Sequence, residues 1–184
     1  MYDKRTVTLQ EIQALFEGAL QDFYTRDSVL LEYDTEEAAV AERCMVFRIG
    51  WYMLNRMQTL PTLSQADLDC EYNRNFDHPK SMYRHTLEGI TSKIKDAVPD
   101  LLIHGRRSNE NNLLVIEFKK GAPSAESVLV DEEKLMYFTD SAKEYRYDWG
   151  LYVELHKHSV GIRVYQNGQH KSHLDYTFHP TMAR

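Results

Sequence analysis

Two short apolar segments, separated by a polar loop, constrain the fold of this chain more than any other feature. Residues 97–104 and 112–120 are rich in leucine, isoleucine and valine, whereas residues 106–111 between them are polar. Short segments of this composition are typical of strands, and a short polar connection allows two of them to pair. The sequence therefore predicts a β-hairpin over residues 97–120.

The register of this hairpin brings charged side chains together. If the turn is centred on Ser108 and Asn109, Asp100 lies directly opposite Glu117. Directly opposed residues share one face of a sheet, with Cβ atoms roughly 4.5–5.5 Å apart. Lys119 lies two residues beyond Glu117 and therefore points to the same face. We expect two carboxylates and one ammonium group at one end of the hairpin, provided that no bulge shifts the register.

Two carboxylates this close together indicate a cation site. Without a cation they would repel each other, and the pKa of one would rise. Mg²⁺ prefers oxygen ligands and would relieve the repulsion. A third carboxylate, Glu42, shares an inward-facing helical stripe with Met45 and Ile49, and a glutamate in that position needs a partner. The sequence therefore favours a divalent metal near Asp100, Glu117 and Glu42.

The remaining periodicity predicts helices and further strands around the hairpin. Thr8 and Glu11 have the spacing of a capping box and begin a helix that ends near residue 24. A second helix starts near Asp34 and ends near Met57. This order of elements predicts an α/β fold (α+β mixed sheet) flanked by helices. The other periodic segments are a helix over 131–145 and strands over 67–72, 149–155 and 160–165, whereas 73–95 has no clear period.

The length and composition set limits on organisation and function. The 184 residues suffice for one domain, with a helical extension over 8–33, a core over 34–166 and a C-terminal tail over 167–184. The formal net charge of -6 argues against a basic nucleic-acid coat protein, but it does not exclude a local positive surface. No apolar segment is long enough to cross a membrane, and the polar N-terminus lacks a signal-peptide core. We therefore expect a cytoplasmic protein without a membrane partner.

The charged motif of the hairpin resembles that of a known enzyme superfamily. Pro99-Asp100 followed by Glu117-Phe118-Lys119, with Glu42 upstream on a helix, is similar to the motif of the PD-(D/E)xK nucleases, also called restriction-endonuclease-like. The resemblance spans about residues 34–165 and implies an αβββαβ core, preceded here by an extra N-terminal helix. Four strings resemble small bacterial and phage members of this superfamily: 47–52, 71–74, 112–120 and 131–135.

The resemblance implies a metal-dependent nuclease that hydrolyses phosphodiester bonds, and we expect its substrate to be DNA. In such a site Asp100 and Glu117 hold Mg²⁺ or Mn²⁺, with the Phe118 carbonyl and Glu42 as further ligands. Lys119 orients the attacking water and stabilises the growing negative charge. The side chains predicted to bind the substrate are Lys134, Arg74, Lys80 and Lys120.

Several alternatives stay open at this point. The same site could act on RNA, which the sequence does not distinguish from DNA. The fold could also belong to a binding or regulatory protein that needs a partner for activity. A homodimer or another protein partner is compatible with the sequence, although no pattern identifies either. Lys134 could be a solvated lysine on a helix, and Arg74 could pair with Glu71 or Asp69 instead of a phosphate.

Overall fold

A mixed β-sheet forms the centre of the computed structural model, which describes residues 2–32, 40–76, 78–85, 91–95 and 97–181. The sheet has seven strands in the order β1-β6-β7-β8-β9-β10, and β11 also pairs with β9. β7 and β8 run parallel, whereas the other described neighbours run antiparallel. The strands are β1 (Asp67–Cys70), β6 (Leu101–His104), β7 (Leu114–Lys120), β8 (Trp149–Leu155), β9 (Val160–Gln166), β10 (Gln169–His170) and β11 (Tyr176–Phe178).

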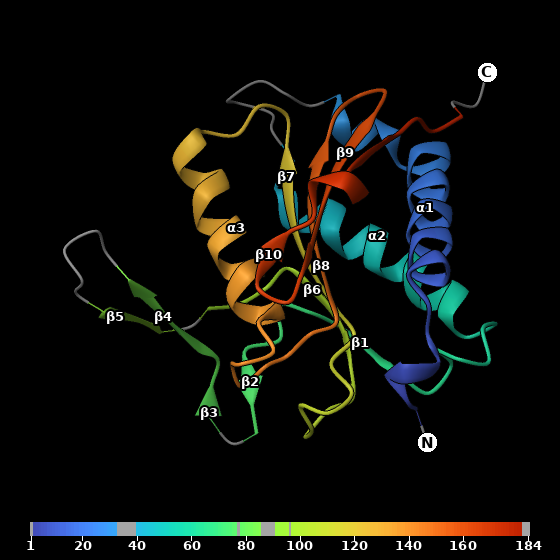
Figure 1. Ribbon diagram of the computed structural model, residues 1–184. Helices are drawn as coiled ribbons and strands as arrows, with labels where there is room; N and C mark the ends of the chain where they lie inside the picture. The colour runs from blue at the N-terminus through green and yellow to red at the C-terminus, as the bar shows by residue number, and fades with distance from the viewer. Residues whose placement is uncertain (1, 33–39, 77, 86–90, 96, 182–184) are drawn as a thin grey trace.

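Helices cover both faces of this sheet (Figure 1). α3 (Ala125–Thr139) lies on one face and connects β7 to β8, because parallel neighbours need such a crossover. α1 (Leu9–Arg26) and α2 (Glu42–Met57) lie on the other face. Side chains alternate along a strand, so β7 buries Ile116 against α1 and α2 and Val115 against α3.

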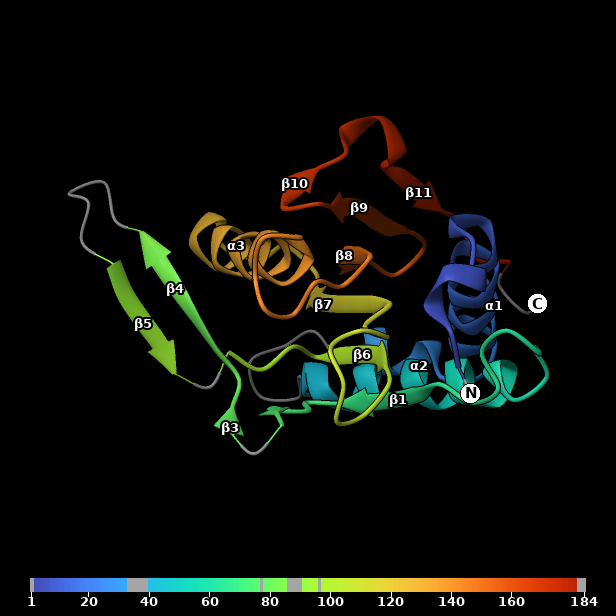
Figure 2. The same cartoon turned by 60° about the horizontal axis from the view of Figure 1, so that its bottom comes forward.

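Short hairpins fill the segment between β1 and β6, where the sequence shows no clear period. β2 (Arg74–Asn75) pairs with β3 (His78–Pro79), and β4 (Ser81–His85) pairs with β5 (Thr91–Lys95). The β4–β5 pair projects away from the body of the molecule (Figure 2). Three single turns of 3-10 helix complete the described elements: η1 (Lys4–Thr6), η2 (Ser28–Leu31) and η3 (Ser172–Leu174).

The predicted hairpin and its register are confirmed. β6 and β7 pair antiparallel, with Leu101 opposite Ile116 and Ile103 opposite Leu114. Both strands are shorter than predicted, and β6 begins at Leu101. Pro99 has no backbone N–H to donate, which explains why the ladder does not extend over residues 97–99. Residue 100 therefore lies directly before β6, at the end of the hairpin that the register predicts.

The N-termini of the helices differ in how well the sequence predicts them. The predicted capping box of α1 is confirmed, since the hydroxyl of Thr8 accepts a hydrogen bond from the N–H of Glu11 at 3.2 Å. For α2, the predicted start near Asp34 lies outside the described residues, and residues 40–41 are not helical. α2 begins at Glu42, whose carboxylate accepts a hydrogen bond from the N–H of Lys120 at 3.0 Å. The N-terminus of α2 is therefore held by this hydrogen bond to β7, because the side chain of Ala41 cannot cap the helix.

The predicted bounds of α3, residues 131–145, are wrong at both ends. The helix begins at Ala125 because Ser124 caps it, accepting a hydrogen bond from the N–H of Ser127 at 3.2 Å. It ends at Thr139, whose hydroxyl donates to the carbonyl of Leu135 at 2.8 Å. Asp131 therefore lies inside the helix and not at its start.

The predicted fold class is confirmed at the level of a mixed sheet flanked by helices. The predicted C-terminal tail adds β10 and β11 to β9. The predicted N-terminal extension contributes Ile12 and Phe16 to the same apolar core as Met45 and Ile49 of α2. None of the described helices has the length and apolar character that a membrane span requires.

A charged cluster connects the edge strand β1 to β6. Asp69 and His104 are diagonal neighbours on the two strands, and the Asp69 carboxylate lies 2.9 Å from His104 Nε2. Arg106 Nε donates to the same carboxylate at 2.9 Å. Burial alone would raise the pKa of Asp69, but the hydrogen bonds from His104 and Arg106 outweigh it and hold the pKa well below its usual range.

Replacing Asp69 with asparagine should lower the free energy of unfolding by about 1.5–3 kcal/mol at neutral pH, because hydrogen bonds to a charged acceptor are lost. The pKa of Asp69 in the folded state lies below the value of about 3.9 for an unfolded chain. The ionised carboxylate therefore makes its full contribution to the free energy of unfolding above roughly pH 5, and this contribution is lost as the pH falls toward the folded pKa. Urea unfolding at neutral pH and near pH 3 would measure it. Glu110→Gln, at an exposed carboxylate, is the control, and an equal Asp69→Asn effect at both pH values would contradict this account.

Candidate active site

The candidate site lies where β7 extends beyond β6. The ladder between the two strands ends at Ile116, so Phe118 and Lys120 have no β6 partner for their backbone N–H groups. Carboxylates take the place of the missing strand, because Asp100 Oδ2 accepts from Phe118 N at 2.8 Å and Glu42 Oε2 accepts from Lys120 N at 3.0 Å. Buried backbone donors require partners. The end of β7 therefore positions both carboxylates.

Alternate residues of β7 point to α3. Glu117 and Lys119 share the face of Val115, which packs in the core on the α3 side. α3 contributes Asp131 and Lys134, which are three residues apart and therefore adjacent on the helix surface. We call the resulting group the carboxylate–lysine cluster; its members are Glu42, Asp100, Glu117, Lys119, Asp131 and Lys134.

Ion pairs connect five of the six members of the cluster, all but Asp100. Lys134 Nζ lies 3.1 Å from Glu117 Oε2 and 2.9 Å from Asp131 Oδ1. Lys119 Nζ lies 2.6 Å from Asp131 Oδ2 and 3.6 Å from Glu42 Oε1. Each ammonium group thus lies between two carboxylates, and α2, β7 and α3 meet through these contacts.

Burial raises the free energy that is required to ionise the carboxyl groups of the cluster. The side chain of Glu117 is only 1% exposed, and this burial, together with the charge of Asp100, raises its pKa well above the usual range. Burial also raises the pKa of Asp100 and the pKa of Glu42, against the hydrogen bonds that both accept from β7. The pKa of Lys119 is raised too, because its interaction with Asp131 outweighs burial. An additional cation would lower the cost of ionising these carboxyl groups.

The donor groups of the cluster suit a divalent metal in charge and chemistry. Its four carboxylates and two ammonium groups would carry a formal charge of -2 with all groups ionised. Glu117 Oε1 is buried and has no hydrogen-bond partner among the described residues. Carboxylate and carbonyl oxygens are the ligands that Mg²⁺ prefers. In the described part of the chain no three acidic, histidine or cysteine side chains already surround one point, and the ammonium groups of Lys119 and Lys134 lie between the carboxylates.

A pocket of about 590 Å³ adjoins the cluster. Glu42 and Asp100 line it together with Phe47 of α2, whose side chain is exposed. Two further lining residues, Arg43 and Glu71, form an ion pair at 2.6 Å. A ligand can therefore approach two of the four carboxylates from this side.

The structure brings five of the predicted site residues into the cluster, places two beside it and leaves two apart from it. The Phe118 carbonyl accepts a hydrogen bond from Lys119 Nζ at 3.2 Å, and Lys120 adjoins through its backbone while its ammonium donates to the Leu30 carbonyl at 3.3 Å. Lys80 is 2% exposed and donates to a backbone carbonyl at 3.1 Å, away from the cluster. Arg74 is exposed in β2 and is also apart from it. Their binding to a substrate stays a prediction.

Asp131 is the member of the cluster that sequence reasoning missed. A helix starting at residue 131 would leave this carboxylate at a solvated N-terminus, where acidic residues are common. The spacing of Asp131 and Lys134 carries the missing signal, because three residues inside a helix place both side chains on one face. Ser124 would have identified the true start, and with it the inward position of Asp131.

Comparison with known proteins gives no independent assignment. No protein-family model, curated protein or solved structure matches this chain.

In buffer containing EDTA, Lys134→Met should lower the free energy of unfolding by on the order of 2 kcal/mol, because Glu117 loses its ion-pair partner in a buried position. Glu117→Gln should raise it by about 1 kcal/mol, since residues at functional sites are often kept at a cost in stability. Urea unfolding of both variants measures these opposite changes. Lys157→Met, at an exposed lysine 4.0 Å from Glu32, is the control and should change stability little. A stabilising effect of Lys134→Met would contradict the account of the cluster.

Proposed function

We propose that this protein is a metal-dependent nuclease of the PD-(D/E)xK superfamily that hydrolyses phosphodiester bonds, most readily in DNA. The observation that carries the proposal is the convergence of Asp100, Glu117 and Lys119 at the end of one hairpin. Glu42 on the preceding helix reaches the same place. The strand–helix–strand connection through α3 is compatible with this superfamily and adds two charged side chains to the motif.

Asp100, Glu117 and Glu42 are the side chains that would hold Mg²⁺ or Mn²⁺, with the Phe118 carbonyl as a further oxygen donor. Such a metal, when bound, would polarise a phosphoryl oxygen and lower the pKa of the attacking water. The hydrogen bonds from β7 to Asp100 and Glu42 fix the directions of these carboxylates beforehand. Fixed ligands lower the reorganisation that binding requires.

The two lysines of the cluster have distinct roles in this proposal. Lys119 is 20% exposed and contacts both Asp131 and Glu42, so its ammonium can orient a water molecule and stabilise negative charge on a phosphate. Lys134 contacts the more deeply buried Glu117 and can bind a phosphate oxygen if that ion pair opens. Asp131 positions both lysines, because its two carboxylate oxygens contact one each.

One observation favours a second candidate, a nuclease-fold binding or regulatory protein that needs a partner. In the described geometry the ammonium of Lys134 already pairs with Glu117, which is the most buried of the acidic ligands in the first proposal. An ammonium can neutralise these carboxylates without any metal. In that case the protein would form a stable complex with its partner, and the isolated chain would cleave no nucleic acid.

Cleavage of nucleic acid by the purified protein tests the first proposal. Plasmid DNA, single-stranded DNA and RNA are incubated separately with Mg²⁺, with Mn²⁺ and with EDTA. We expect metal-dependent cleavage, fastest on DNA, and a loss of about 10²–10³-fold in Lys119→Ala, because a group that stabilises transition-state charge is removed. Lys157→Ala is the matched control, since Lys157 is exposed and lies outside the cluster. The proposal fails if no substrate is cleaved with metal, or if Lys119→Ala equals the wild type.

Metal binding can be measured independently of cleavage. Titration of the EDTA-treated protein with Mn²⁺, followed by electron paramagnetic resonance, should show binding that Asp100→Asn weakens by at least about tenfold. A metal that binds the folded state should also raise the melting temperature of the wild type. Glu110→Gln serves as the control, because it removes an exposed carboxylate from the β6–β7 turn. Equal affinities in the two variants would remove Asp100 from the metal site.

A further inference from the structure

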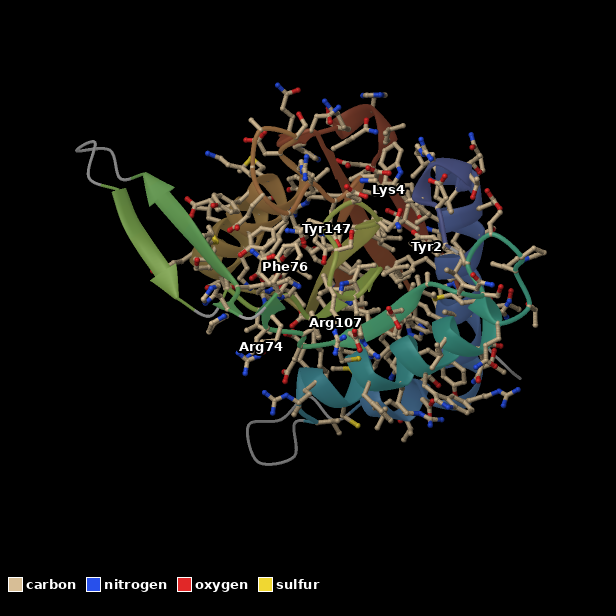
Figure 3. The ribbon with its side chains drawn as sticks, turned by 90° about the horizontal axis from the view of Figure 1, so that it is seen from below. Tyr2, Lys4, Arg74, Phe76, Arg107 and Tyr147 are labelled. Atoms are coloured by element: carbon tan, nitrogen blue, oxygen red, sulfur yellow. The ribbon has the colours of Figure 1, made fainter. Side chains whose placement is uncertain are left out.

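A second pocket lies at the opposite end of the β6–β7 hairpin from Asp100. It has a volume of about 640 Å³ and is lined by Tyr72, Arg74, Phe76 and Arg107. Arg107 belongs to the turn after β6, whereas Arg74 and Phe76 belong to the β2–β3 hairpin. Figure 3 labels Arg74, Phe76 and Arg107, which lie near one another on this face of the molecule. We call these four residues the arginine pocket.

The two guanidinium groups of the arginine pocket form no ion pairs with the described residues. Neither Arg74 nor Arg107 pairs with a described carboxylate, although both are exposed. The neighbouring Arg106, by contrast, is engaged by Asp69 and by Asp67. Two exposed guanidinium groups give this pocket a local positive charge on a protein of net charge -6, and such a charge attracts anions. Guanidinium groups bind phosphate with well-defined geometry.

Aromatic rings accompany this charge. The side chain of Phe76 is 58% exposed, and its backbone φ of 53° lies in the left-handed region, which bulky residues rarely adopt. Neither burial nor backbone preference therefore accounts for a phenylalanine at this position. The ring of Tyr72 is held in place, with the His104 ring 4.8 Å away and Lys80 Nζ 4.9 Å from its centroid. The pocket thus combines an exposed aromatic face with a fixed one.

A ladder of amide side chains holds the two halves of the pocket together. Asn109 Nδ2, in the β6–β7 turn, donates to Asn75 Oδ1 of β2 at 3.0 Å. Asn112 Nδ2 donates to Asn109 Oδ1 at 3.2 Å and to the Tyr145 carbonyl at 2.7 Å. Asn112 is 1% exposed, so this support extends into the core. The β6–β7 turn that carries Arg107 is therefore tied to the strand β2 that carries Arg74.

We propose that the arginine pocket binds one nucleotide of a single-stranded nucleic acid, with a base stacked on Phe76 and the adjacent phosphate held by Arg74 and Arg107. Stacking on aromatic side chains next to basic groups is how proteins hold unpaired strands, whose base faces are accessible. Paired bases do not offer those faces. This inference deepens the proposed function, since the strand bound here would be the same polymer that reaches the carboxylate–lysine cluster.

Binding in the presence of EDTA tests the inference without cleavage. Fluorescence anisotropy of a labelled oligothymidylate gives the Kd and its dependence on salt for the wild type and each variant. Phe76→Leu should raise the Kd at least about fivefold, whereas Phe76→Tyr, which keeps an aromatic face, should not. Arg107→Gln and Arg74→Gln should each weaken binding and lower the salt slope by about 0.7. Arg26→Gln is the control, because Arg26 is exposed on α1 and has no described carboxylate partner.

Unchanged Kd values in the Phe76→Leu and Arg107→Gln variants would overturn the inference, and so would equal weakening by Arg26→Gln. Competition by thymidine monophosphate as strong as that by the oligonucleotide would show a site for free nucleotides and would also overturn it. Cleavage of the same oligonucleotide with Mn²⁺ distinguishes nuclease activity from strand binding by the arginine pocket. If the oligonucleotide is cleaved and the pocket variants bind it as the wild type does, the proposed function holds and the pocket inference fails. If binding depends on the pocket but no cleavage occurs, the pocket inference holds and the proposed function fails.

Discussion

The pairing of Leu101 with Ile116 is the contact on which the candidate site depends. Because strand side chains alternate, this register directs Glu117 and Lys119 to the α3 side and Phe118 to the core beneath α1 and α2. A slip of one residue would exchange the two faces and place a carboxylate among apolar side chains. The apolar residues of the hairpin therefore align the charged ones, and packing of the sheet is a condition for the chemistry at its end.

The charges are held together by a balance between burial and pairing. A buried carboxylate is costly unless a cation is close, and Lys134 supplies that cation from α3. Asp131 couples the balance to the second lysine, Lys119. The helix that closes one face of the sheet thus also neutralises the site, and a substitution that improves one of these roles can weaken the other.

The parts of the fold that depend on short-range pattern are predictable from the amino-acid sequence. The hairpin register follows from strand alternation about a symmetric turn, and the inward position of Glu42 follows from helical spacing. Asp131 was not predicted, because its role depends on a cap seven positions earlier in the chain, at Ser124. The hairpins between β1 and β6 have no apolar period to reveal them. Whether Arg74 and Arg107 lie together depends on contacts between distant loops, which local pattern does not contain.

The separation of Glu42 from the rest of the cluster along the chain has a consequence for folding. Residues 100–134 contain the other members, within one hairpin and the helix that follows it. Contacts that are close in sequence form at lower entropic cost than distant ones. The bond between Glu42 and the backbone of Lys120 joins residues that are 78 positions apart. This bond forms only when α2 docks on the sheet, so completing the site requires the closure of a long loop, whereas its other members come together within one hairpin and helix.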